Sequence, residues 1–144
     1  MTLYLADTSI WAWADKDPES NLTRKLADRF ARDEIATCPV VVLESLHRAR
    51  SGEAYERMFG RRFALLRSFP VTEQSGERAV QLQRKLAAGT HGNHCRPAAD
   101  FLIAAAAEEA GPDVTLWFFD KDLRVICEHT GQPADAEVST GTGH

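Results

Sequence analysis

The chain has 144 residues, 44% of them hydrophobic and 26% charged, which is enough for one folded domain and too few for two of ordinary size. Its 17 basic and 21 acidic residues give a net charge of −4, which excludes a histone-like protein that holds nucleic acid by bulk charge. The three cysteines, Cys38, Cys95 and Cys127, are an odd number scattered along the chain, which argues against a disulfide framework and favours the cytosol. No apolar run approaches the roughly 18 residues of a membrane span, and the N-terminus does not resemble a signal peptide, so we expect neither membrane insertion nor secretion.

In the first half of the chain, short apolar runs alternate with amphipathic segments. Thr8 and Ser9 can each cap a helix that follows the first apolar run, and Pro39 suits a first helical position. The predicted elements are a strand at 3–6, helices at 10–14 and 22–30, a strand at 35–38, a helix from 39 that is broken at Gly52, and a helix over 55–66.

The second half continues the alternation. Gly111 and Pro112 stand in the order expected at a helix end, and the segment 89–96 has the composition of a loop. The predicted elements are a strand at 69–72, a helix from 79 to Gly89, an alanine-rich helix at 98–110, a buried strand at 116–119, a helix at 121–129 and an edge strand within 131–138.

Strands that are apolar throughout and alternate with helices are typical of a parallel sheet covered on both faces. The sequence therefore predicts an α/β fold, a three-layer α/β/α sandwich with a central, mainly parallel sheet. We expect a single domain over residues 1–138 and a disordered tail over 139–144.

Four acids occupy positions that the fold would bring together. Asp7 follows the first strand and Asp120 the fourth, and ligands of open parallel sheets collect at the carboxyl ends of strands. Glu44 interrupts an apolar helix face formed by Val40, Val41 and Leu43, and Asp100 lies in the first turn of a helix whose inward surface is alanine and isoleucine. A buried acid is costly unless it is paired or bound to a metal, so we expect a cation among these side chains.

Carboxylate oxygens suit Mg²⁺ or Mn²⁺, and Asp122, two residues beyond Asp120, can complete the ligand shell or hold a water of the metal. Each acid taken alone also has an ordinary structural interpretation. Asp120 can cap a helix, Asp100 can favour a helix N-terminus, Glu44 can be solvated and Asp7 can belong to a turn.

The segments around these acids carry a family resemblance. They read LADTS with Asp7, VVLESL with Glu44, PAADFLIAAAA with Asp100, and FFDKDL with Asp120 and Asp122. In this order and spacing they resemble PIN-domain ribonucleases, specifically the VapC toxins of bacterial toxin–antitoxin pairs, over about Leu3 to Val138. One departure is Phe118, which stands where family members often have Thr or Ser, so a hydroxyl near Asp120 is missing.

The resemblance implies a PIN-like fold and a metal-dependent endoribonuclease. Its catalytic residues would be Asp7, Glu44, Asp100 and Asp120, which would line a site for one or two Mg²⁺ or Mn²⁺ ions. Asp122 would lie close by, and Thr8 or Ser9 would help to orient a ligand or a water. A metal-activated water would then hydrolyse an RNA phosphodiester. The resemblance further implies a VapB-type antitoxin as partner, and a homodimer.

Basic residues offer candidate contacts to RNA. Six arginines stand between Arg48 and Arg67 against two acids, and Arg57 and Arg61 share one helix face. An RNA-facing patch and a merely solvated helix face are both open interpretations. Arg96, one turn before Asp100, can pair with that acid or meet a phosphate, and Lys121 between two aspartates can do the same.

Other interpretations of the sequence rank lower. A haloacid-dehalogenase-like phosphatase needs a second aspartate two residues after Asp7, where this chain has Ser9. A zinc site at His91, His94 and Cys95 lacks a second ligand pair at suitable spacing. A catalytically silent PIN-like domain that binds RNA or protein remains the alternative function. Trp11 and Trp13 cannot both face the core, and we expect Trp11 to do so.

Overall fold

A computed structural model describes residues 2–89 and 93–137. Its centre is a five-stranded sheet in which every neighbouring pair of strands is parallel. The strands are β1 (Leu3–Ala6), β2 (Ile35–Thr37), β3 (Arg67–Ser68), β4 (Val114–Phe118) and β5 (Ala134–Ala136). The strand order is β3-β2-β1-β4-β5, so β1 lies in the middle and the chain builds outward from it in both directions.

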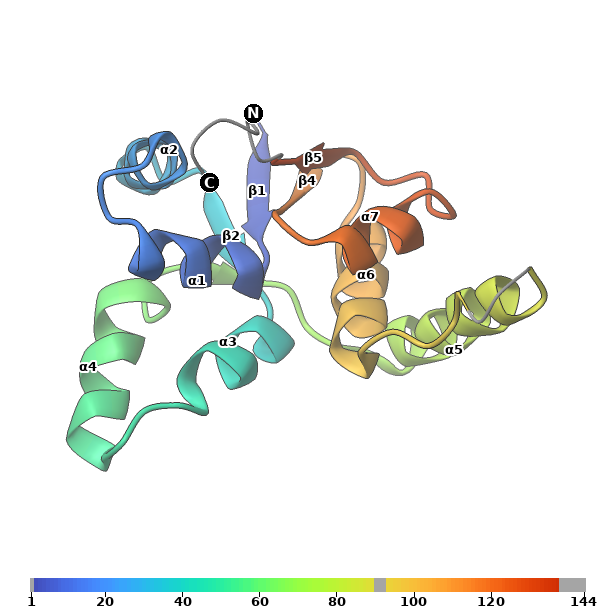
Figure 1. The fold of residues 1–144 in the computed structure, drawn as a ribbon, viewed down its shortest axis with the longest axis horizontal. Coiled ribbons are helices and arrows are strands. Elements are labelled where there is room, and N and C mark those ends of the chain that lie inside the picture. Colours follow the sequence, from blue (N-terminus) through green and yellow to red (C-terminus); the bar gives the residue numbers. More distant parts are fainter. Residues whose placement is uncertain (1, 90–92, 138–144) are drawn as a thin grey trace.

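Helices cover both faces of this sheet. They are α1 (Thr8–Lys16), α2 (Asn21–Ala31), α3 (Pro39–Leu46), α4 (Gly52–Arg62), α5 (Glu73–Ala87), α6 (Ala98–Ala110) and α7 (Lys121–Cys127). Helices α1 to α4 lie on one side and α5 to α7 on the other (Figure 1). This division follows from right-handed crossovers, because the chain moves one way from β1 to β3 and the opposite way from β3 to β5. The predicted α/β/α sandwich with a parallel sheet is confirmed.

Local sequence explains where the helices begin. The side chains of Ser20, Ser51 and Thr72 each accept a hydrogen bond from a backbone N–H in the first turn of the helix that follows. Pro39 is the first residue of α3, as predicted. Gly52, predicted to break a helix, instead begins α4, because Ser51 caps that helix and α3 has already ended at Leu46.

The core is formed by β1, β2 and β4 and by the helix faces that cover them. Leu5, Leu116 and Trp117 have no exposed surface, and alanines of α6 pack closely against the sheet. Trp11 is 5% exposed, with its ring edge-on to Phe63 at 5.3 Å between centroids, so the predicted core role of Trp11 is confirmed.

Two further local predictions are wrong. The third strand was expected at Phe69–Thr72 but consists of Arg67–Ser68. The Phe69 N–H donates to the carbonyl of Thr37 at 2.9 Å, and Pro70 then offers no N–H, so pairing stops there. The expected apolar face of α3 is also incomplete, because Leu43 is 66% exposed.

A cation of α2 holds the edge strand β5 and its neighbours in place. The Arg29 guanidinium of α2 lies over the rings of Tyr4 and Trp117, at 3.6 and 4.4 Å from their centroids, and pairs with Asp135 of β5. Glu137 accepts hydrogen bonds from Lys25 and from the indole N–H of Trp117. The expected edge strand within 131–138 is thus present at Ala134–Ala136, and the predicted tail over 139–144 lies outside the described residues.

Within the described part of the chain, no helix combines the length and apolarity that crossing a membrane requires.

Candidate metal centre

Two of the candidate acids stand at the carboxyl ends of adjacent strands. Asp7 follows β1 and caps α1, and Asp120 follows β4 by two residues and caps α7. The strands pair in register from Leu3 opposite Val114 to Ala6 opposite Trp117, so both acids emerge at the same edge of the sheet. The interpretation of Asp120 as a helix cap is therefore correct. Asp7, expected in a turn, caps α1 in place of Thr8 or Ser9, which lie inside that helix. Capping does not account for all the oxygens of these two acids.

Each capping acid commits one oxygen to its helix. Asp120 Oδ1 accepts the N–H groups of Asp122 and Leu123 at 2.6 and 3.3 Å, and Asp7 Oδ2 accepts the N–H and the hydroxyl of Ser9 at 3.0 and 2.6 Å. Asp7 Oδ1 is buried without a hydrogen-bond partner among the described residues. A buried carboxylate oxygen without a partner is unfavourable, so it calls for a cation or a proton.

Asp100 brings a third carboxylate from α6, on the opposite side of the sheet from α1. It lies in the first turn of that helix, is only 5% exposed, and its Oδ2 has no partner within the described chain. Carboxylate oxygens of Asp100, Asp120 and Asp122 lie within 4.8 Å of one another, which is close enough for one ion to contact all three.

The electrostatics of the cluster reflect this crowding. Burial, followed by the charges of Asp120, Asp7, Glu44 and Asp122, raises the pKa of Asp100 to about 8. Burial also raises the pKa of Asp7 to about 6, although the hydrogen bonds from Ser9 act in the opposite direction. The five acids therefore form one interacting group, of which Asp100, Asp120 and Asp122 have carboxylate oxygens within 4.8 Å of one another.

Two hydroxyls hold Asp7 and Glu44 in place. Thr8 Oγ1 donates to Glu44 Oε1 at 2.7 Å and so fixes the α3 carboxylate against α1. Ser9 Oγ donates to Asp7 and also accepts the backbone N–H of Phe119 at 2.9 Å, which ties the end of β1 to the segment after β4. Phe118, where the family resemblance leads us to expect a hydroxyl, is 2% exposed and belongs to the core.

The candidate basic residues lie at different distances from the acids. Arg96 donates to Asp122 rather than to Asp100, and its Nε donates to the carbonyl of Asn93 at 2.8 Å. Lys121 is exposed in the first turn of α7, between Asp120 and Asp122. Arg57 and Arg61 are exposed on α4, which lies beyond α3 as seen from α6 and α7 (Figure 1).

Sequence reasoning missed two features of this site. One is the pairing of Arg96 with Asp122, which depends on a loop conformation that spacing does not encode. The other is the stacking of Trp13 on Phe119, with nearly parallel rings 4.8 Å apart beside Asp120. The only signal for that pair was that Trp13 could not face the core together with Trp11.

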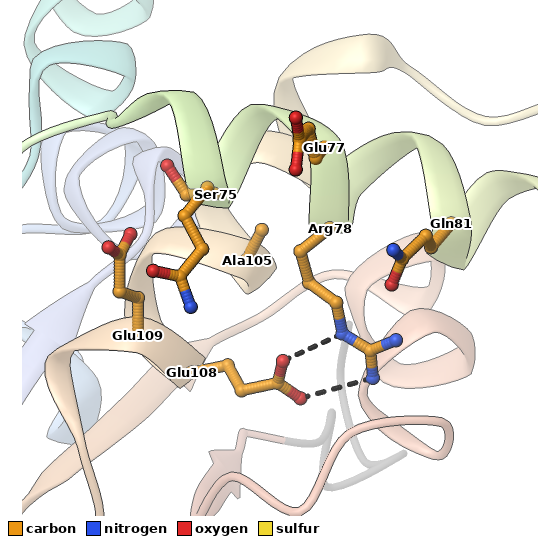
Figure 2. Close-up of a pocket in the computed structure, with 8 residues that line it drawn as sticks. Ser75, Glu77, Arg78, Gln81, Ala105, Glu108 and Glu109 are labelled. Carbon is orange, nitrogen blue, oxygen red and sulfur yellow. Dashed lines mark hydrogen bonds and ion pairs between the residues drawn. The ribbon is translucent and has the colours of Figure 1, made fainter.

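A separate hollow lies between α5 and α6 (Figure 2). Arg78 and Glu108 form a two-bond ion pair across it, at 2.7 and 3.3 Å, and Thr72 donates to Glu109. These interactions join two packed helices, and the buried oxygens without partners at Asp7 and Asp100 belong to the acid cluster rather than to this hollow. The acid cluster is therefore the candidate functional site.

Comparison with known proteins agrees with the geometry. The family model of the PIN domain matches residues 4–128. This chain belongs to the PIN domain family. It is 36% identical over 142 residues to ribonuclease VapC18 of Mycobacterium tuberculosis, covering 97% of this chain and 98% of that protein. Ribonuclease VapC51 of the same organism is 31% identical, with 96% of each chain covered. The resemblance to VapC-type PIN ribonucleases is thus confirmed.

Solved structures support the same fold. The structure of DNA-bound VapBC from Salmonella typhimurium superposes with a TM-score of 0.68 at 16% identity, covering 94% of this chain and 98% of that chain. VapBC-5 from Mycobacterium tuberculosis gives a TM-score of 0.60 at 17% identity, with 96% and 100% covered. At these identities the likeness concerns the fold, and the PIN-like α/β/α architecture is confirmed.

Proposed function

We propose that this PIN domain is a divalent-metal-dependent endoribonuclease and the toxin of a VapBC-type pair. The observation that carries the proposal is the convergence of Asp7, Asp100 and Asp120 from three elements, with two buried carboxylate oxygens that have no partner among the described residues. A site built only to stabilise the fold would pair these oxygens. The curated relatives VapC18 and VapC51 carry the name ribonuclease, which supports RNA as the substrate.

The donor set fits Mg²⁺ or Mn²⁺. The acids of the cluster offer carboxylate oxygens, which hard divalent cations prefer. Asp7, Asp100 and Asp120 would hold the cation, and Asp122 and Glu44 would complete its surroundings. When bound, such a cation supplies Lewis acidity toward a phosphodiester and an attacking water.

The side chains of this domain then have distinct tasks. Ser9 and Thr8 keep Asp7 and Glu44 oriented through the bonds described above, so two carboxylates stay in place without a cation. Asp100, with a pKa raised to about 8, would be protonated at neutral pH in the metal-free site and would release this proton when a divalent cation binds. Arg96 neutralises Asp122, which lowers repulsion at the outer edge where an RNA phosphate would approach.

Several basic residues would contact RNA around the acids. Lys121 is exposed directly beside Asp120, and Arg96 lies one turn before Asp100. Arg57 and Arg61 on α4 would contact a longer RNA, away from the cleaved bond. Arginine suits this task because its guanidinium can donate two parallel hydrogen bonds to a phosphate.

The remaining parts of the proposal concern partners and location. The solved VapBC-5 structure belongs to a family of toxin–antitoxin systems, and a VapB-type antitoxin is accordingly the proposed partner of this chain. A homodimer is the proposed assembly. The cytosol is the proposed compartment, since Cys38, Cys95 and Cys127 are all free thiols.

The experiment is cleavage of RNA by purified protein with Mn²⁺ or Mg²⁺, compared between wild type and Asp7→Asn. The wild type should cut and the variant should not, while Glu53→Gln on the exposed start of α4 should match the wild type. Equal cleavage by wild type and Asp7→Asn would refute the proposed site. RNA binding with neither cleavage nor a Mn²⁺-dependent stabilisation that Asp7→Asn abolishes would instead identify a silent PIN-like binding domain.

A further inference from the structure

A hollow of about 450 Å³ adjoins the acid cluster on the β5 side. The segment after β4 and the start of α7 form one wall, and the end of β5 forms the other. Asp120 lies at its edge, so the hollow shares a residue with the candidate metal centre. Its lining residues are Phe118, Phe119, Asp120, Lys121, Arg124, Ala136 and Glu137.

The wall of this hollow carries an aromatic side chain held in a fixed orientation. The Phe119 ring stacks on Trp13 with 9° between the ring planes, and the backbone N–H of Phe119 is bound by Ser9. Both rings are partly exposed, and Lys16 lies 5.5 Å from the centre of the Trp13 ring. A partly exposed aromatic pair that is locked in place offers a flat surface on which another ring can stack.

The same wall carries positive charge. Lys121 and Arg124 are exposed one helical turn apart, and neither forms an ion pair within the described chain. The acid of the opposite wall, Glu137, is already neutralised by Lys25 at 2.6 Å. The hollow therefore combines an aromatic surface with two cations that lack an acidic partner among the described residues, beside carboxylates that are proposed to hold a metal.

We propose that this hollow is a subsite for one nucleotide of single-stranded RNA, next to the cleaved phosphate. The base stacks on Phe119, with Trp13 supporting the ring, and Lys121 and Arg124 contact the backbone phosphates. Aromatic stacking and cationic phosphate contacts are two of the main interactions by which proteins hold single-stranded RNA. The proposal rests on the ribonuclease function above, and it makes Phe119 a determinant of substrate affinity rather than of the chemical step.

The first test is equilibrium binding of a short fluorescent single-stranded RNA in EDTA, together with cleavage kinetics in Mn²⁺. Phe119→Leu should weaken binding and raise KM by about tenfold, with kcat within about twofold of wild type. Phe119→Tyr, which keeps an aromatic ring, should restore both. Thermal unfolding with and without Mn²⁺ should match wild type in both variants, which establishes that the fold and the acids are intact.

The second test separates charge from stacking. Lys121→Gln and Arg124→Gln should each reduce the slope of log affinity against log salt by about 0.7, as expected for one phosphate contact to a single strand. Lys85→Gln on the exposed face of α5 is the matched control and should leave the slope unchanged. RNA should also quench the fluorescence of Trp13, and Trp13→Phe should abolish the quench because Trp11 and Trp117 are buried.

The outcomes distinguish the subsite from the function on which it rests. Wild-type affinity and KM in a folded Phe119→Leu would overturn the subsite and leave the ribonuclease intact. If Phe119→Leu, Lys121→Gln and Arg124→Gln all bind RNA like wild type but are no longer inhibited by an antitoxin, the hollow binds a protein partner. That result would likewise overturn the proposal. A wild-type protein that neither binds nor cuts RNA would refute the proposed function itself.

Discussion

Asp100→Asn should stabilise the metal-free protein at neutral pH while removing its response to metal. The Asp100 side chain is buried among four other acids, and its pKa in the folded protein is about 8, against an ordinary value of 3.8. Between these two pH values the unfolded chain releases the Asp100 proton and the folded protein keeps it. The contribution of Asp100 to stability is therefore most favourable at acid pH and becomes less favourable as pH rises toward 8.

The expected gain in stability follows from the pKa shift of Asp100. Each pKa unit corresponds to about 1.4 kcal/mol, so holding Asp100 protonated at pH 7 costs the folded state at most roughly 4 kcal/mol. An asparagine at this position is neutral in both states and avoids that cost, although its buried amide also needs partners. We expect Asp100→Asn to exceed wild type by about 2 kcal/mol in free energy of unfolding at pH 7.5, and the difference to shrink toward pH 5.

The assay is urea unfolding in EDTA between pH 5 and pH 8.5, followed by circular dichroism. Mn²⁺ should restore the stability of wild type at pH 8 more than at pH 6, because metal binding displaces the proton of Asp100. It should have little effect on Asp100→Asn. Glu53→Gln, an exposed acid on α4, is the control and should follow wild type at every pH. Equal pH dependence in wild type and Asp100→Asn would refute the argument that buried, mutually repelling carboxylates form this site.

Three further changes test other contacts. Ser9→Ala removes the hydroxyl that binds both the N–H of Phe119 and an oxygen of Asp7. The free energy of unfolding should fall by about 1–2 kcal/mol, and Mn²⁺ should bind several-fold more weakly. Wild-type unfolding and wild-type Mn²⁺ affinity by calorimetry would contradict this. Arg96→Gln removes the cation from Asp122 and should strengthen Mn²⁺ binding several-fold in a titration at low salt, more than Lys121→Gln does, whereas weaker binding would show that Arg96 is needed to shape the site. Arg29→Met removes the cation over the rings of Tyr4 and Trp117 and leaves Asp135 without its ion-pair partner. We expect the free energy of unfolding in urea to fall by about 2 kcal/mol, and a fall below about 0.5 kcal/mol would show that Arg29 does not stabilise this edge.

The alternation of apolar runs with amphipathic segments was sufficient to predict the parallel sheet and its helices. Buried strands such as β1 and β4 are apolar over most of their length, so their signal is strong. The third strand was misplaced because β3 is an exposed edge strand of two residues, Arg67 and Ser68, with no apolar pattern. The apolar Phe69 led to the misplaced prediction. Its side chain is buried in the core, but its backbone forms the last hydrogen bond of β3 to β2.

The candidate site also combines features that the sequence predicts with features that only packing decides. Strand ends identified Asp7 and Asp120 as neighbours, because the topology of a parallel sheet places such positions at one edge. The sequence could not reveal that Arg96 pairs with Asp122 instead of Asp100, because that choice depends on the path of the loop before α6. Leu43 was expected on a buried face, yet the way α3 packs leaves it exposed.

What the amino-acid sequence determined by itself is the set of elements and the order of the acids along them, since hydrophobic period, capping residues and prolines act over a few neighbours. Tertiary structure alone decided how closely the carboxylates approach, which of their oxygens lack partners, and which ring Trp13 supports. Those features arise where segments far apart in sequence meet, as Asp7 and Asp120 do, and distances across such contacts are set by packing rather than by local pattern.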